Sequence, residues 1–111
     1  MDIVLELQDN LEKLNKCLQE LKMNGIALAE AEKTYKIILR QECLKLRDEG
    51  MAVGMIDKTC YGIPVVAEAR FNRDVAEAKY KANIEAINTY KLTIKILQDM
   101  IDKEFYNGNE V

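Results

Sequence analysis

The chain has 111 residues, of which 49% are apolar and 32% are charged, with one proline and five glycines. This composition predicts an all-α protein of long amphipathic helices, because long stretches run without a helix breaker. The absence of histidine and the net charge of −3 exclude His-dependent triads and His–Cys zinc sites, and argue against general nucleic-acid binding, which relies on neutralising phosphates.

Residues 2–49 have the apolar spacing of an amphipathic helix. Leucines and one valine recur at alternating steps of three and four from Val4 to Leu21, which is typical of a coiled-coil seam. Gly50 is well placed to end this helix as a C-terminal cap. Gly25 interrupts the stripe, and glycine inside a helix costs about 1 kcal/mol relative to alanine. The sequence therefore leaves open whether the first helix is continuous through Gly25.

Residues 50–65 are expected to form a compact tip, because they contain three of the five glycines and the only proline. A short helical turn is expected within the tip, at about residues 52–60. A second long helix is expected from about residue 65 to residue 106, with a seam that again alternates steps of four and three. This helix has to return along the first, so the prediction is a single helical domain, residues 1–111, built as a long antiparallel hairpin.

The apolar stripes are wider than one seam between two helices can bury. Left in water, each aliphatic side chain beside the seams forgoes about 1.5–3 kcal/mol of burial. The sequence therefore predicts a homo-oligomer, a dimer or higher, in which the hairpins pack as a helical bundle; a monomeric three-helix bundle that turns at Gly25 is the alternative. Asn83, a polar residue on the second seam, is predicted to set register and oligomeric state. The additional aliphatic residues are Ile3, Ile26, Ile37, Leu44, Ile84, Leu92 and Ile96.

The four arginines all flank the tip, at Arg40, Arg47, Arg70 and Arg73. Arginine makes planar, bidentate contacts to phosphate and carboxylate groups that lysine does not make. Together with Tyr61, which offers a stacking face, the arginines are candidate ligand-binding residues for a nucleotide-like anion or an acidic partner. The alternative interpretation is that nearby carboxylates neutralise them within the hairpin: Glu42, Asp48, Glu49, Glu68, Asp74 and Glu77.

No catalytic residue, metal ligand or cofactor site is predicted. Cys17, Cys43 and Cys60 have spacings that fit neither a CxxC motif nor a zinc knuckle, and they are expected to be reduced thiols. A cysteine nucleophile would lack a histidine base, and no phosphate-binding glycine loop is present. No apolar run is long enough to span a bilayer. We therefore expect a cytoplasmic protein that is not an enzyme and has no membrane partner.

Three segments carry a resemblance to a known group of proteins: residues 46–51 (LRDEGM), 73–78 (RDVAEA) and 86–91 (AINTYK). From about residue 5 to residue 104, the chain resembles small all-helical proteins of unknown function from phages and prophages of Firmicutes. The resemblance implies an accessory protein made in the host cytoplasm during infection, with no catalytic residues to carry over. The tip sequence at residues 59–62 departs from the pattern.

These observations together favour binding without catalysis, in the setting of counter-defence against the host. The protein would either sequester a nucleotide-like anionic ligand or block a host protein. The alternatives are an accessory protein for recombination or single-strand DNA and a purely structural coiled-coil oligomer. The acidic net charge and the few aromatic residues make nucleic acid a less favoured partner, because single strands bind to positively charged grooves and aromatic platforms.

Overall fold

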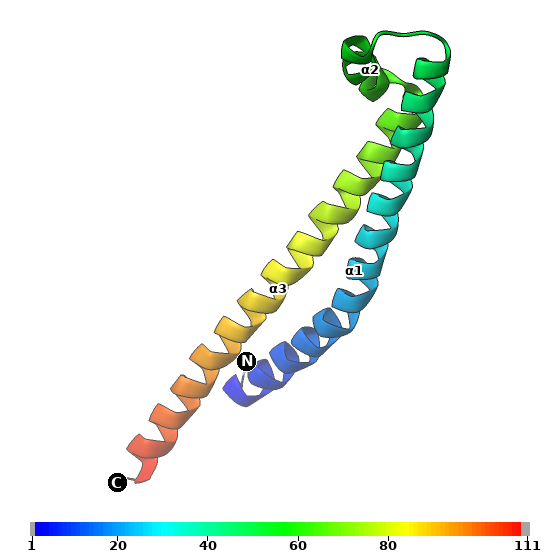
Figure 1. The fold of residues 1–111 in the computed structure, drawn as a ribbon. Coiled ribbons are helices and arrows are strands. Elements are labelled where there is room, and N and C mark those ends of the chain that lie inside the picture. The colour runs from blue at the N-terminus through cyan, green and yellow to red at the C-terminus, as the bar shows by residue number, and fades with distance from the viewer. Residues whose placement is uncertain (1, 110–111) are drawn as a thin grey trace. The chain divides into compact units, whose positions relative to one another are not determined.

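The computed structural model describes residues 2–109, and of these the side chains of residues 2–106. The chain forms α1 (Ile3–Asp48), α2 (Val53–Thr59), the 3-10 helix η1 (Cys60–Gly62) and α3 (Pro64–Asn109), as Figure 1 shows. No strand occurs within residues 2–109. The predicted all-α class and the long helical hairpin with a compact tip are therefore confirmed.

Helix α1 is capped at both ends, by a side chain at its start and by a backbone motif at its end. The Asp2 carboxylate accepts a hydrogen bond from the backbone N–H of Val4 at 3.0 Å, which satisfies one of the free donors of the first turn. At the other end Gly50 has a φ of 89°, a left-handed conformation that suits glycine. The backbone N–H groups of Gly50 and Met51 donate to the carbonyls of Arg47 and Leu46 at 3.0 and 3.1 Å. This is a Schellman motif, and it stops the helix.

Helix α1 is continuous through Gly25. The position that a Cβ would occupy on Gly25 lies 3.9 Å from the Tyr80 ring, so the helix meets α3 at ordinary contact distance there. Most residues around Gly25, such as Met23, Ala27 and Leu28, are good helix formers, and packing along α3 offsets the weakness of one glycine. The alternative of a three-helix bundle with a turn at Gly25 is therefore wrong.

The tip and the second long helix follow the prediction with small shifts. The expected short turn is α2, which continues directly into η1. Ile63 is extended, with ψ of 128°, as a residue before proline prefers, and Pro64 then begins α3 at the helical position where its missing N–H is not needed. Helix α3 runs three residues beyond the predicted end, through Gly108 to Asn109.

The chain packs as two compact units: the first comprises Met1–Met23 and Lys81–Val111, and the second comprises Asn24–Tyr80. Within each unit α1 and α3 run side by side in opposite directions (Figure 1). In the first unit α3 buries Asn83, Ile87, Ile94 and Leu97. The core of the second unit contains Tyr35, Val66 and Ala69, with Ile38, Leu39 and Ile63 packed against it.

The predicted seam on α3 is confirmed, because all of its members are buried or half-buried. They are Ala76, Tyr80, Asn83, Ile87, Tyr90, Ile94, Leu97 and Ile101. The seam on α1 is only half right. Every second member of the seam is half-buried, namely Leu7, Leu14 and Leu21. The members between them, Val4, Leu11 and Leu18, remain exposed. The face of α1 that packs against α3 also includes Asn10 and Cys17, which are half-buried.

Candidate functional site

A groove lies between α1 and α2 in the second unit. It has a volume of about 320 Å³. Its α1 wall is formed by positions 40, 43, 44 and 47, which share one helix face because they are spaced by three and four residues. Its α2 wall repeats the same spacing at positions 53, 56 and 57. The residues of this α1–α2 groove are Arg40, Cys43, Leu44, Arg47, Val53, Ile56 and Asp57.

Arg40 and Arg47 are the cations of the groove. Both are exposed, and within the described part of the chain neither makes an ion pair or a hydrogen bond. Glu42, a carboxylate expected to neutralise them, is paired with Lys45 at 3.2 Å. Asp57 on the opposite wall is exposed. The groove thus combines two unpaired guanidinium groups, one carboxylate and an apolar lining.

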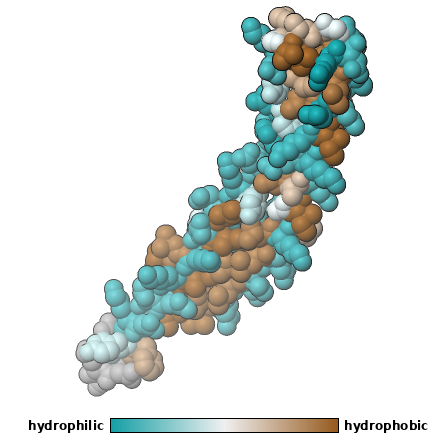
Figure 2. All heavy atoms as spheres, viewed as in Figure 1, coloured by the Kyte–Doolittle hydropathy of each residue, from teal (hydrophilic) through white to brown (hydrophobic). Residues whose placement is uncertain are grey.

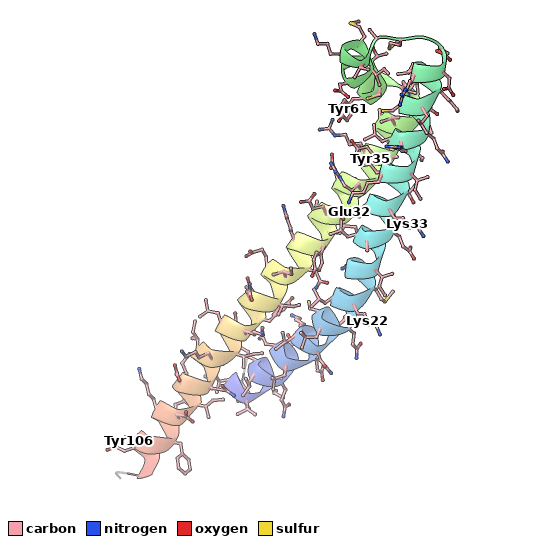
Figure 3. The ribbon with its side chains drawn as sticks, in the orientation of Figure 1. Lys22, Glu32, Lys33, Tyr35, Tyr61 and Tyr106 are labelled. Atoms are coloured by element: carbon pink, nitrogen blue, oxygen red, sulfur yellow. The ribbon has the colours of Figure 1, made fainter. Side chains whose placement is uncertain are left out.

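Arg70 and Arg73 are engaged elsewhere in the second unit. The Arg70 guanidinium lies 5.7 Å from the centroid of the Tyr61 ring, and that of Arg73 lies 4.8 Å from the centroid of the Tyr35 ring. Arg73 also donates to the Asp74 carboxylate, with an Nη2–Oδ1 distance of 2.8 Å, and this hydrogen bond raises the pKa of Arg73. Figure 3 labels both tyrosines, Tyr61 at the tip and Tyr35 on α1.

The structure therefore divides the predicted arginine site into two pairs. Arg40 and Arg47 line the α1–α2 groove, whereas Arg70 and Arg73 each cover a tyrosine and do not belong to the groove lining. Internal neutralisation, the alternative interpretation, holds for Arg73 alone among the four. The sequence contained one signal for this division, because positions 40 and 47 are seven residues apart and so share a helix face.

Two cysteines lie at or beside the groove. Cys43 is part of its α1 wall, and the Cys60 thiol donates a hydrogen bond to the backbone carbonyl oxygen of Asp57, with an Sγ–O distance of 3.8 Å. Cys60 is only 1% exposed, and Cys43 is half-buried. Burial first, and then the influence of the Cys60 thiol, raise the pKa of the Cys43 thiol. The Cys43 thiol is therefore protonated at neutral pH. The sequence did not indicate that Cys43 lines a groove.

Asn83 occupies the buried seam of the first unit, with 7% of its surface exposed. Its Nδ2 donates a hydrogen bond to the backbone carbonyl oxygen of Cys17 at 3.0 Å. The bond joins α3 to α1 within one chain, so the polar side chain has an acceptor inside the hairpin. Its predicted role in oligomeric state stays a prediction.

The first unit exposes an apolar stripe on α1, formed by Val4, Leu11 and Leu18. These residues are spaced by seven, and each is 44–46% exposed. An open hollow of about 400 Å³ lies along the same helix, lined by Leu11, Leu14 and Leu18 with Glu12 and Asn15. Figure 2 shows apolar residues gathered in a continuous area on the visible face of this unit.

Residues 2–109 contain no cluster of three or more side chains that would suit a metal ion. Within the same range, none of the helices has the length and apolarity needed to cross a bilayer. Comparisons of the chain with protein families, with curated proteins and with solved structures find no match.

Proposed function

We propose that this chain is a binding protein without catalytic activity, and that it holds a nucleotide-like anion in the α1–α2 groove. The observation that carries the proposal is the pair Arg40 and Arg47, which line one groove and have no partner among the described residues. Unpaired guanidinium groups on a shared helix face are ready to make bidentate, charge-assisted hydrogen bonds to phosphate.

The groove also restricts the class of anion. Seven residues along an α-helix correspond to a rise of about 10 Å, so Arg40 and Arg47 can contact two separate parts of one ligand. Leu44, Val53 and Ile56 offer apolar surface for its uncharged body. Asp57 repels a nearby phosphate but accepts a hydrogen bond from an amino or hydroxyl group. A phosphate joined to a planar, amino-bearing base meets all three requirements.

The setting that we propose for this binding is counter-defence. In a phage accessory protein, which the sequence resemblance implies, binding without turnover would withdraw a nucleotide-like signal in the host cytoplasm. A host protein is the second kind of target that we consider, and an acidic segment of it would use the same two arginines. Both versions require an intact groove and no chemistry by the chain itself.

Calorimetric titration with a panel of mono-, di- and cyclic nucleotides tests the proposal. We expect at least one nucleotide to bind the wild type and Arg47→Lys to weaken that binding about tenfold, because lysine retains the charge but loses the bidentate geometry. Lys45→Gln is the matched control, because Lys45 is an exposed cation on α1 outside the groove lining. Circular dichroism checks that each variant is folded. No heat from any nucleotide with the wild type would refute the nucleotide version.

We also propose that the chain forms a homo-oligomer. A purely structural role for that oligomer is the alternative to ligand binding. The observation that favours it is the apolar stripe Val4, Leu11 and Leu18, whose spacing of seven residues suits packing against another helix. Six of the seven aliphatic residues predicted to lie beside the seams are also exposed: Ile26, Ile37, Leu44, Ile84, Leu92 and Ile96. Large exposed patches of apolar side chains are typical of interaction faces.

A further inference from the structure

Asp57 is the one carboxylate among the described residues that line the α1–α2 groove. It lies on the α2 wall, whereas Arg40 and Arg47 lie on the α1 wall. Its side chain is exposed, and within the described part of the chain that side chain makes no ion pair or hydrogen bond. A carboxylate only accepts hydrogen bonds. A ligand in the groove therefore binds best when it presents N–H or O–H donors to Asp57.

The residues around Asp57 suit a flat ring. Val53 and Ile56 belong to the same wall, because positions 53, 56 and 57 are spaced as neighbours on one face of α2, and Leu44 belongs to the α1 wall. A planar base that packs against these apolar side chains can turn its edge toward the Asp57 carboxylate. The donors and acceptors on that edge then decide which base the groove accepts.

The nucleobases differ in what they offer a carboxylate. Guanine has two adjacent donors on one edge, N1–H and the N2 amino group, so it can give a carboxylate two parallel hydrogen bonds. Adenine and cytosine have a ring nitrogen acceptor beside the amino group, and uracil has a carbonyl oxygen on each side of its N–H. These acceptors repel a carboxylate. Guanine also offers O6 and N7, the pair of acceptors that arginine binds in a bidentate manner.

We propose that the nucleotide held in the groove is a guanine nucleotide and that Asp57 selects its base, a step that rests on the proposed function. Asp57 accepts hydrogen bonds from N1–H and from the N2 amino group of guanine. One of the two groove arginines binds the O6 and N7 edge, and the other binds the phosphate. One ligand thus satisfies Arg40, Arg47 and Asp57 together, which no other common base does.

Calorimetric titration of the full chain with the 5′-monophosphates of guanosine, inosine and adenosine tests this selection. The three share ribose and phosphate and differ only in the base. Guanosine monophosphate is expected to bind at least about tenfold more tightly than adenosine monophosphate, because adenine loses both hydrogen bonds and places an acceptor against the carboxylate. Inosine monophosphate lacks only the N2 amino group, so its affinity is expected to lie between the two.

Asp57→Asn assigns the preference to this side chain. The amide keeps one acceptor and replaces the other with a donor, so guanosine monophosphate is expected to bind about tenfold more weakly. Xanthosine monophosphate, with a carbonyl oxygen in place of the N2 amino group, is expected to bind more tightly than it binds the wild type. Asp48→Asn is the matched control, because Asp48 is an exposed carboxylate of the same unit outside the groove lining. Circular dichroism checks that both variants are folded.

Failure of guanine selection is distinguishable from failure of anion binding. A wild type that gives no heat with any mono-, di- or cyclic nucleotide refutes the proposed function, and guanine selection with it. Nucleotide binding with no preference for guanine would overturn the selection alone and leave anion binding in place. A guanine preference that Asp57→Asn changes no more than Asp48→Asn does would remove Asp57 from base recognition.

Discussion

Asn83 on α3 donates a hydrogen bond to the backbone carbonyl oxygen of Cys17, 66 positions earlier in the chain, at a distance of 3.0 Å. An amide in an apolar seam requires a partner, because an unsatisfied buried polar group costs about 1–3 kcal/mol. Only those registers of α3 against α1 that place a carbonyl opposite Asn83 meet this requirement. We therefore expect the bond to favour this register of the first unit as well as to stabilise the unit.

Asn83→Asp is expected to lower the free energy of unfolding by about 2–4 kcal/mol at neutral pH, because a carboxylate cannot donate to the Cys17 carbonyl and its charge is buried. Urea unfolding measures the loss. Burial raises the pKa of the new carboxyl in the folded state above its unfolded value, so the loss is present above the folded pKa and diminishes as the pH falls through it. Asn88→Asp on the exposed face of α3 is the control, and equal losses for the two variants would contradict the role of the bond.

Replacing the tip glycines Gly50 and Gly54 with alanine is expected to change the free energy of unfolding in opposite directions. Gly50 has a φ of 89°, which alanine adopts only with strain, so Gly50→Ala is expected to destabilise the protein by about 1–2 kcal/mol. Gly54 lies inside α2 with no atom within 4 Å of an added Cβ, so Gly54→Ala is expected to stabilise it by about 0.5–1 kcal/mol. Thermal or urea unfolding measures both changes. Changes of the same sign would show that backbone conformation does not govern these positions.

The contact of Arg73 with Tyr35 is expected to contribute more than its ion pair with Asp74. Tyr35 is a core residue with 8% exposure, and the Arg73 guanidinium covers its ring at 4.8 Å. Arg73→Gln is expected to lower the urea midpoint of unfolding more than Asp74→Asn does, because it removes the cation–π attraction and the packing on Tyr35. Asp74→Asn removes only an exposed ion pair and is expected to cost less than about 0.5 kcal/mol. Urea unfolding that ranks the two variants in the reverse order would assign the stabilisation to the ion pair.

Periodicity predicted α3 better than α1 for a physical reason. On α3 the apolar residues at steps of four and three lie on one face, and that face is the one that α1 covers. On α1 two adjacent stripes are apolar, one through Leu7 and Leu14 and one through Val4 and Leu11. Hydrophobicity alone does not tell which of the two stripes faces the returning helix. Asn10, which is half-buried on the covered face, is polar and so gave no apolar signal.

The groove was less predictable than the helices because it depends on how the tip folds back. Residue type indicated that Arg40 and Arg47 suit an anion, and their spacing placed them on one face. That this face of α1 lies opposite Asp57 follows from the backbone path through Gly50 and α2. That path is set by a few dihedral angles, and sequence periodicity contains no information about them.

The chain is expected to self-associate through the apolar stripe, and sedimentation equilibrium at tens of micromolar measures this association. We expect the wild type to have a mass that is a multiple of 12.7 kDa, because pairing of two stripes buries side chains that a single chain leaves 44–46% exposed. Leu11→Glu is expected to shift the protein to monomer, since it places a charge at the centre of the stripe, while the helix remains folded. Leu5→Glu is the matched control, because Leu5 is as exposed but lies on a different face of α1. A monomeric wild type, or equal dissociation by the two variants, would exclude this stripe as the interface.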